Sequence, residues 1–259
     1  METNKKAQKN NELIYALDFD GVICDSAIET SITGWKAARK IWQDISSTLP
    51  PEKLITDFRQ VRPFLETGYE AILIMRLLDQ GVSVKSLCES YAILLKQLIC
   101  NNNLDINNLK KLFGDTRDDW IKTNIQEWLQ MNPFFEDIQQ ALKKIAMHHC
   151  YIITTKQERF VQQILQANNI QCQDNRIYGM EKNKSKAETL LELIKKHPYQ
   201  RIVFIEDRLP TLINIKHKPQ LQTIKLQLAT WGYNTAEDKQ KALTHSIETI
   251  NLKQFIADA

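Results

Sequence analysis

Residues 13–22 read LIYALDFDGV and place two carboxylates, Asp18 and Asp20, one residue apart directly after an apolar run. Such a run is typical of a buried strand. Because side chains alternate along a strand, both carboxylates would point to one side if the strand continued to Asp20. Their repulsion then needs a cation. Oxygen ligands favour Mg²⁺ over zinc, whose Cys and His ligands are missing here except for Cys24. The stretch therefore predicts a magnesium site at the end of the first strand.

The composition is that of a soluble globular protein. The chain has 259 residues, of which 43% are hydrophobic and 25% charged, enough for one large domain or two modest ones. Its formal charge of +3 comes without a concentrated basic stripe, so we expect no nucleic-acid partner. Five widely separated cysteines that form no CxxC pair indicate reduced thiols and a cytoplasmic location. The composition gives no indication of oligomeric state.

Neither a membrane segment nor secretion is expected. The most apolar helix-like stretches, residues 71–78 and 91–100, are interrupted by Arg76 and Lys96 and are too short to cross a bilayer. Residues 1–11 are polar and contain lysine but no apolar h-region. A disordered lead-in fits this segment better than a signal peptide.

Helical patterns dominate the middle of the chain, and strands return after it. Periodicity predicts helices over residues 28–42, 51–62, 69–78, 84–100 and 115–129. From residue 133 onward, helices alternate with short apolar strands, which is typical of a parallel sheet covered by helices. The helices expected there are 134–147, 157–167, 186–196 and 209–215, and the strands are 150–154, 202–205, 223–228 and 246–250.

The helical block is too long to be an ordinary connection, because βα loops are usually only a few residues. We therefore expect the class α/β, with a Rossmann-like, doubly wound parallel sheet formed by residues 1–24 and 133–259. Residues 25–132 are predicted to form an inserted all-α cap domain. Its linkers would let it rock over the carboxyl ends of the strands, where ligands bind in such sheets.

Four segments in the right order resemble the motifs of the haloacid dehalogenase (HAD) superfamily of phosphohydrolases. Each places a polar residue at a strand end or a helix start: Asp18–Val22 with Asp25-Ser26, Tyr151–Thr155, Lys186–Leu190, and Ile202–Asp207. In the second motif we choose Thr154, since Thr155-Lys156 then falls where such proteins often carry Asn-Lys. In the third, Lys184 fits nearly as well as Lys186. The resemblance spans essentially the whole chain and implies a phosphatase-like hydrolase with a helical cap.

The resemblance implies a role for each residue. Asp18 would attack phosphorus to form an aspartyl-phosphate, and Asp20 would protonate the departing alkoxide and then take a proton from water. Mg²⁺ would be held by Asp18, the Asp20 backbone carbonyl and Asp207, with Glu206 binding directly or through water. Thr154, Thr155 and Lys186 would contact the phosphoryl group.

Asp20 favours phosphate esters, because dehalogenases and phosphonate-cleaving members carry a different residue there. One departure is Thr211, where many relatives place another acid four residues after the fourth-motif aspartate. The adjacent acids Glu206-Asp207 match a variant of the fourth motif in which two neighbouring acids serve at the metal site.

We therefore predict a Mg²⁺-dependent hydrolase of a small phosphorylated metabolite. A phosphomutase of the same superfamily is the first alternative, and a non-catalytic protein that binds a phosphorylated ligand is the second. The complete set of acids argues against the latter.

Three further segments of the sequence allow two interpretations each. Arg62 either reaches the distal group of a substrate from the cap or is an ordinary surface arginine. His148-His149 lacks partner ligands and is expected to form a solvated turn rather than a metal site. The segment Trp231–Asn234 either lies on the rim of the active site or packs for its aromatic rings alone.

Overall fold

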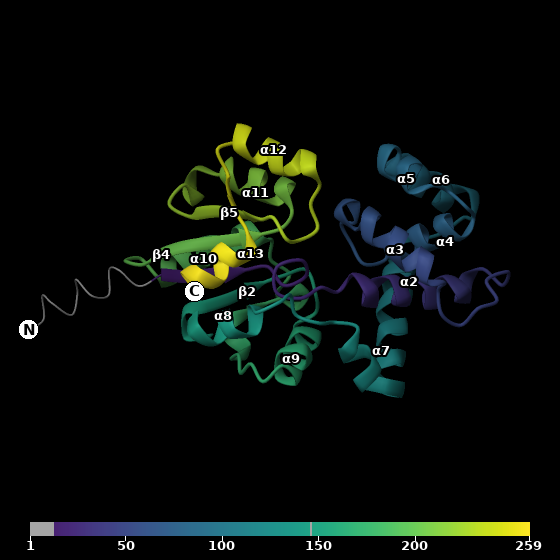
Figure 1. The fold of residues 1–259 in the computed structure, drawn as a ribbon, viewed down its shortest axis with the longest axis horizontal. Helices are drawn as coiled ribbons and strands as arrows, with labels where there is room; N and C mark the ends of the chain where they lie inside the picture. Colours follow the sequence, from purple (N-terminus) through teal and green to yellow (C-terminus); the bar gives the residue numbers. More distant parts are fainter. Residues whose placement is uncertain (1–12, 146) are drawn as a thin grey trace, which may run out of the picture. The chain divides into compact units, whose positions relative to one another are not determined.

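The computed structural model describes residues 13–145 and 147–259 (Figure 1). The lead-in expected at residues 1–11 lies outside these ranges. The chain folds into two compact units. An α/β unit comprises the described residues up to Asp25 together with Phe134–Ala259, and a helical unit comprises Ser26–Pro133. Within the described ranges, no helix has both the length and the apolar character that crossing a membrane requires.

The α/β unit is built on a six-stranded sheet with the order β3-β2-β1-β4-β5-β6. All neighbouring strands are parallel. This confirms the expected α/β class with a doubly wound sheet. The strands are β1 (Leu13–Leu17), β2 (Cys150–Ile153), β3 (Ile177–Tyr178), β4 (Arg201–Glu206), β5 (Lys225–Ala229) and β6 (Glu248–Ile250). β3 was not predicted, because two residues are too few to form a recognisable apolar run.

Among the described residues, five α-helices precede or connect the strands of this sheet after β1, and a sixth follows the last strand. They are α8 (Ile138–Ile145), α9 (Glu158–Ala167), α10 (Lys186–Lys196), α11 (Leu209–Lys216), α12 (Ala236–Thr244) and α13 (Leu252–Asp258). Short 3-10 helices lie at Met147–His149, Asp174–Arg176, Met180–Lys182 and Pro219–Leu221. Apolar residues of α10, α11 and α12 pack with Ile14, Ala16 and Phe204 in one buried cluster. Tyr15 points to the opposite face of the sheet. There the Phe255 ring of α13 packs edge-on against it, with 6.1 Å between the ring centroids.

The helix predicted from residue 134 begins later, at Ile138. Phe134 forms an antiparallel bridge with Cys24, and the Phe135 N–H donates to the Ile23 carbonyl at 3.1 Å. Asp137 then adopts a φ of 60°, which no α-helical residue has. The start of this segment is therefore held in a non-helical form by the chain that follows β1.

The helical unit contains six α-helices within its described residues. They are α2 (Ala27–Ile41), α3 (Glu52–Val61), α4 (Glu70–Asp79), α5 (Val84–Glu89), α6 (Tyr91–Asn101) and α7 (Ile106–Gln130), with a 3-10 helix at Arg62–Phe64. α2 and α4 approach closely at Gly34, where an added Cβ would lie 2.7 Å from the Ala71 backbone. Glycine at this position therefore lets the two helices pack backbone to backbone.

Two helix predictions in this unit were wrong in their limits. The single helix expected over residues 84–100 is two helices, because Ser90 has φ −129° and ψ 28° and interrupts the helical path. α7 begins at Ile106 rather than 115, where the Asp105 side chain accepts the Asn108 N–H. It is also kinked at Asn124, whose side chain accepts the Glu127 N–H and caps the second half.

Candidate active site

The two acidic strand ends lie side by side because β1 and β4 are neighbours in register. Leu17 pairs with Ile205, and the Asp18 N–H donates to the Ile205 carbonyl at 2.9 Å. The next residues along the two strands, Asp18 and Glu206, therefore meet at the carboxyl-terminal edge of the sheet. This is the edge at which open α/β sheets bind ligands.

Three buried carboxylates and a lysine meet at this edge. Carboxylate oxygens of Asp18, Glu206 and Asp207 lie within 4.8 Å of one another, and all three residues are buried. The Lys186 Nζ lies 2.9 Å from Asp18 Oδ1 and 2.6 Å from Glu206 Oε2. Lys186 is the first residue of α10, whose start is fixed by a capping box between Ser185 and Glu188. Local helix capping therefore positions the cation of the site.

The cluster carries more negative than positive charge. The pKa of Asp18 is raised to about 7, because burial and the charge of Glu206 raise it more than Lys186 lowers it. Burial also raises the pKa of Glu206, against the lowering effect of Lys186. For Lys186, burial alone would lower the pKa, but the charges of Asp18 and Glu206 raise it above its ordinary value. The ammonium group is thus held charged, and the pKa values of Asp18 and Glu206 stay raised in spite of it.

This donor set fits a hard divalent cation such as Mg²⁺. Mg²⁺ prefers oxygen ligands and is commonly bound by one or two carboxylates together with substrate phosphate oxygens. Asp18, Glu206 and Asp207 supply such oxygens from two adjacent strand ends. Their unbalanced charge is the electrostatic condition that a divalent ion would relieve.

The segment after β5 holds this edge together. The Tyr233 N–H donates to Asp207 Oδ2 at 2.7 Å, and the Tyr233 hydroxyl donates to Asp25 Oδ1 at 2.8 Å. The Asn234 side-chain amide donates to the Asp207 carbonyl at 3.0 Å, and the Trp231 indole N–H to the Val22 carbonyl at 3.0 Å. Packing of aromatic rings alone does not account for residues 231–234, because this segment forms hydrogen bonds with Asp207 and with the loop after β1.

Two glycines allow this close approach. Gly21 has φ +89°, and an added Cβ would lie 1.9 Å from Asp207 Oδ2. At Gly232, an added Cβ would lie 2.3 Å from the Gly21 carbonyl oxygen. Any side chain at either position would displace the Asp207 carboxylate or the loop after β1.

The strand does not continue to Asp20, as the prediction of a shared side for both carboxylates had assumed. β1 ends at Leu17, and residues 21–23 form a turn closed by a bridge between Asp20 and Cys24. The Asp20 Oδ1 instead lies 2.9 Å from the Nζ of Lys156. Lys156 was not among the predicted site residues. The available signal was the Thr155-Lys156 pair, which falls where HAD-like proteins often carry Asn-Lys.

Thr154 lies where predicted, directly after β2, and β2 pairs with β1. Its N–H donates to the Tyr178 carbonyl at 2.9 Å, and its Oγ1 accepts the Lys156 N–H at 3.1 Å. The hydroxyl hydrogen remains available to a ligand, because the oxygen acts as the acceptor in that bond. The side chain of Thr155 is exposed.

The other lysine and the arginine considered from sequence lie elsewhere. Lys184 pairs with Glu192 at 2.6 Å, and about half of its side chain is exposed. Between the two lysines, the structure therefore brings Lys186 to the acidic cluster. Arg62 belongs to the helical unit, where it is buried. Its interpretation as an ordinary surface arginine is wrong, because the 3-10 helix that follows α3 turns it into the interior.

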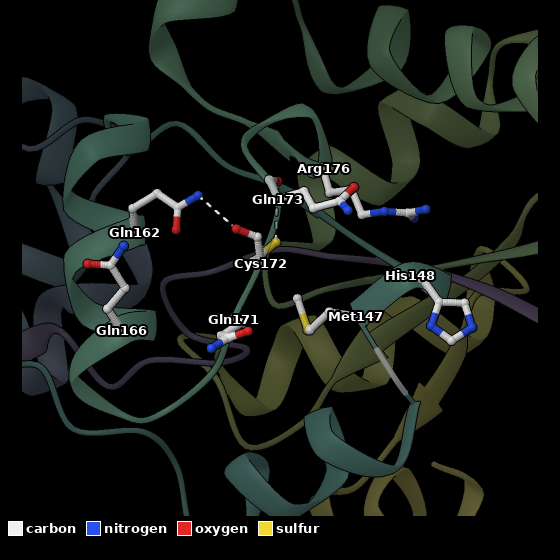
Figure 2. Close-up of a pocket in the computed structure, with 8 residues that line it drawn as sticks. All are labelled: Met147, His148, Gln162, Gln166, Gln171, Cys172, Gln173 and Arg176. Carbon is white, nitrogen blue, oxygen red and sulfur yellow. Dashed lines mark hydrogen bonds between the residues drawn. The ribbon is translucent and has the colours of Figure 1, made fainter.

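A separate surface pocket of about 670 Å³ lies in the α/β unit (Figure 2). Gln162 and Gln166 of α9 line one side of it, and Met147, His148 and Arg176 lie across from them. His148 belongs to the 3-10 helix directly before β2, and Arg176 directly precedes β3. The pocket therefore lies at the amino-terminal ends of these strands, whereas the acidic cluster lies at the carboxyl-terminal ends.

Comparison with known proteins identifies the fold. No protein-family model and no curated protein matches the chain by sequence. A haloacid dehalogenase-like hydrolase from Streptococcus pneumoniae matches in structure with a TM-score of 0.56 at 18% identity, over 96% of this chain and 97% of that one. A predicted phosphatase from Clostridium acetobutylicum gives 0.55 at 16% identity, over 95% and 97%. A predicted phosphoglycolate phosphatase from Haemophilus somnus gives 0.56 at 14% identity, over 96% of both chains.

The chain therefore has the fold of HAD-like hydrolases along nearly its full length. This confirms the fold that the four sequence motifs led us to expect. The residues that carried the resemblance are also those that the fold brings to one edge of the sheet.

Proposed function

We propose that this protein hydrolyses small phosphomonoesters through an aspartyl-phosphate formed on Asp18. The observation that carries the proposal is the meeting of Asp18, Glu206 and Asp207 with Lys186 at the carboxyl ends of β1 and β4. The HAD-like fold supports it, since the similar structures are described as hydrolases and phosphatases. The proposed location of this activity is the cytoplasm.

In the first step, an Asp18 carboxylate oxygen attacks phosphorus and forms a P–O bond as the bond to the substrate's alcohol oxygen breaks. Asp20 donates a proton to that oxygen, so the alcohol leaves neutral. Lys186 holds the attacking carboxylate through its 2.9 Å contact and stabilises charge on the phosphoryl oxygens. Thr154 donates its hydroxyl hydrogen to the same group.

In the second step, water attacks the phosphorus of the aspartyl-phosphate. Asp20, now ionised, accepts the proton of that water, and the bond to the Asp18 oxygen breaks. Inorganic phosphate leaves, and both carboxyl groups return to their starting states. One carboxyl group thus forms the covalent bond while the other moves the proton in both directions.

Asp18, Asp207 and the backbone carbonyl of Asp20 would hold Mg²⁺, with Glu206 beside them. The bound cation supplies positive charge against the phosphoryl oxygens and the carboxylates. The Tyr233 N–H donates to Asp207 Oδ2 at 2.7 Å and restrains this carboxylate. The raised pKa of Asp18, about 7, shows that its ionised form lacks stabilisation, which a bound cation would supply.

A panel of phosphomonoesters, assayed for phosphate release with and without Mg²⁺, tests the proposal. Asp18→Asn should lower turnover by at least about 10³-fold, because the nucleophile is lost. Asp174→Asn, at an exposed aspartate of the same unit, is the matched control and should turn over like wild type. Unchanged turnover in Asp18→Asn would contradict the proposal. Conversion of the substrate into an isomeric phosphomonoester, without release of inorganic phosphate, would identify a phosphomutase instead.

A further inference from the structure

We propose that Lys156 is a positioning residue that holds the Asp20 carboxyl group in place for proton transfer to the leaving alcohol. The inference rests on the proposed function and adds to it a residue that was not among the predicted site residues. The Lys156 Nζ lies 2.9 Å from Asp20 Oδ1, although the two residues are 136 positions apart in the chain.

The burial of Lys156 shows that this contact is not an ordinary surface ion pair. Its side chain is 3% exposed, whereas that of Asp20 is 19% exposed. Removing an ammonium group from water is strongly unfavourable unless a charged partner offsets the loss. A flexible lysine would leave its head group in solvent. The fold therefore directs this ammonium group inward, to Asp20.

The backbone of Lys156 is held on both sides. Its N–H donates to Thr154 Oγ1 at 3.1 Å, and its carbonyl oxygen accepts the Met180 N–H at 3.1 Å. Gly179 packs directly against it, since an added Cβ there would lie 2.7 Å from the Lys156 carbonyl oxygen. The base of the side chain is thus fixed at the end of β2, and the ammonium group has a defined reach toward the loop after β1.

The two lysines of the site divide the carboxyl groups between them. Lys186 contacts Asp18 and Glu206, and Lys156 contacts Asp20. Adjacent carboxyl groups with different proposed roles are therefore held by different cations from different elements. Loss of Lys156 should disturb the proton transfer of Asp20 and leave the contact between Asp18 and Lys186 in place.

The basicity of the leaving group separates this role from a merely structural one. An alkoxide needs a proton in order to leave, whereas 4-nitrophenolate is a good leaving group without one. A residue that positions the proton donor should therefore matter for alkyl phosphates and hardly at all for 4-nitrophenyl phosphate. A residue that only stabilises the fold should affect both substrates equally.

The experiment compares Lys156→Met, Lys156→Arg and the control Lys184→Met on β-glycerophosphate and 4-nitrophenyl phosphate with Mg²⁺ present. For Lys156→Met, we expect kcat on the alkyl ester to fall by about 10²-fold, with a loss below about threefold on the aryl ester and little change in KM. Lys156→Arg should recover part of the loss, because a guanidinium group can form the same ion pair. Lys184→Met, which removes a lysine from an exposed pair, should match wild type.

Equal losses on both substrates, or no loss on either, would overturn the inference while leaving the proposed function intact. Wild-type protein that hydrolyses neither ester would overturn the proposed function and the role of Lys156 with it. A crystal structure of Lys156→Met gives a readout apart from activity. We expect the Asp20 carboxyl group to leave its present position, and an unmoved Asp20 would also overturn the inference. The thermal unfolding midpoint of each variant checks that it is folded.

Discussion

Glu29 in the helical unit and Asp18 in the α/β unit are both buried carboxylates, but the charges around them differ. Arg117 donates to both oxygens of Glu29 at 2.8 Å, and Thr33 and Trp128 add bonds at 2.7 and 3.1 Å. One carboxylate thus meets one guanidinium group in a bidentate pair. Asp18 instead shares Lys186 with Glu206 and lies beside Asp207 as well.

The difference shows how a buried acid that serves structure can be told from one that serves chemistry. The Glu29 pair is balanced in charge and satisfied in hydrogen bonds, so it locks α2 to α7. The cluster around Asp18 has three carboxylates against the ammonium group of Lys186, and burial with the charge of Glu206 raises the pKa of Asp18. Unbalanced buried charge favours binding of a cation, and a balanced pair does not.

Breaking the balanced pair should have the largest effect on stability. Glu29→Gln leaves Arg117, whose side chain is only 11% exposed, without this counter-charge and should lower the free energy of unfolding of the helical unit by about 3–5 kcal/mol. Urea unfolding followed by tryptophan fluorescence measures this, since every tryptophan except Trp231 lies in that unit. The double variant Glu29→Gln/Arg117→Met removes both charges and should lose less. A double variant that loses as much as the single one would show that the charge balance is unimportant.

Addition of Mg²⁺ should act only on the unbalanced cluster. At a concentration of 100 Kd, binding should stabilise the α/β unit by about 2.7 kcal/mol. Hydrogen exchange of amides in β1 and β4 measures the effect, and amides of α2 provide an internal control that should not change. Asp207→Asn removes one of the proposed ligands and should abolish most of the gain. Equal protection of wild type and this variant would place the cation elsewhere.

Removal of one negative charge from the cluster should have the sign opposite to Glu29→Gln. In metal-free buffer at pH 8, Asp18→Asn should raise the stability of the α/β unit by roughly 1–2 kcal/mol. Above a pKa of about 7, the wild-type group is ionised, which burial disfavours first and repulsion by Glu206 second. Hydrogen exchange of the same strand amides in the presence of a chelator tests this. Lower stability of the variant would mean that the cluster is balanced without a cation.

The half-buried carboxylate of Glu70 in the helical unit should produce the smallest effect. Burial raises the pKa of Glu70, although the N–H groups of Glu66 and Thr67 and the Tyr91 hydroxyl donate to it and oppose the shift. The folded state therefore holds this proton at a pH where the unfolded chain has lost it, so stability should fall as pH rises from about 4.5 through the raised pKa. In urea unfolding, the Glu70→Gln variant should lose this dependence of stability on pH. The Glu89→Gln variant, changed at an exposed site, should keep it.

Much of the α/β unit could be predicted because its signals are local. The run before Asp18 and the run before Glu206-Asp207 are apolar and short, and both form strands with acids at or directly after their ends. α10 was predicted with its observed limits, since its apolar residues recur at helical spacing up to Lys196. The break at Ser90 and the kink at Asn124 were missed, because both residues also occur within helices and only their backbone angles mark the interruptions.

The sequence by itself determined which chemical groups this protein has and on which kind of element each one lies, because strand and helix periodicity depend on neighbours a few residues apart. Only the tertiary structure decided which cation meets which carboxylate. Lys156 reaches Asp20 across 136 residues, and Arg117 reaches Glu29 across 88. The physical reason is that strand register, sheet order and helix packing bring such groups together, and these depend on the burial of the whole core.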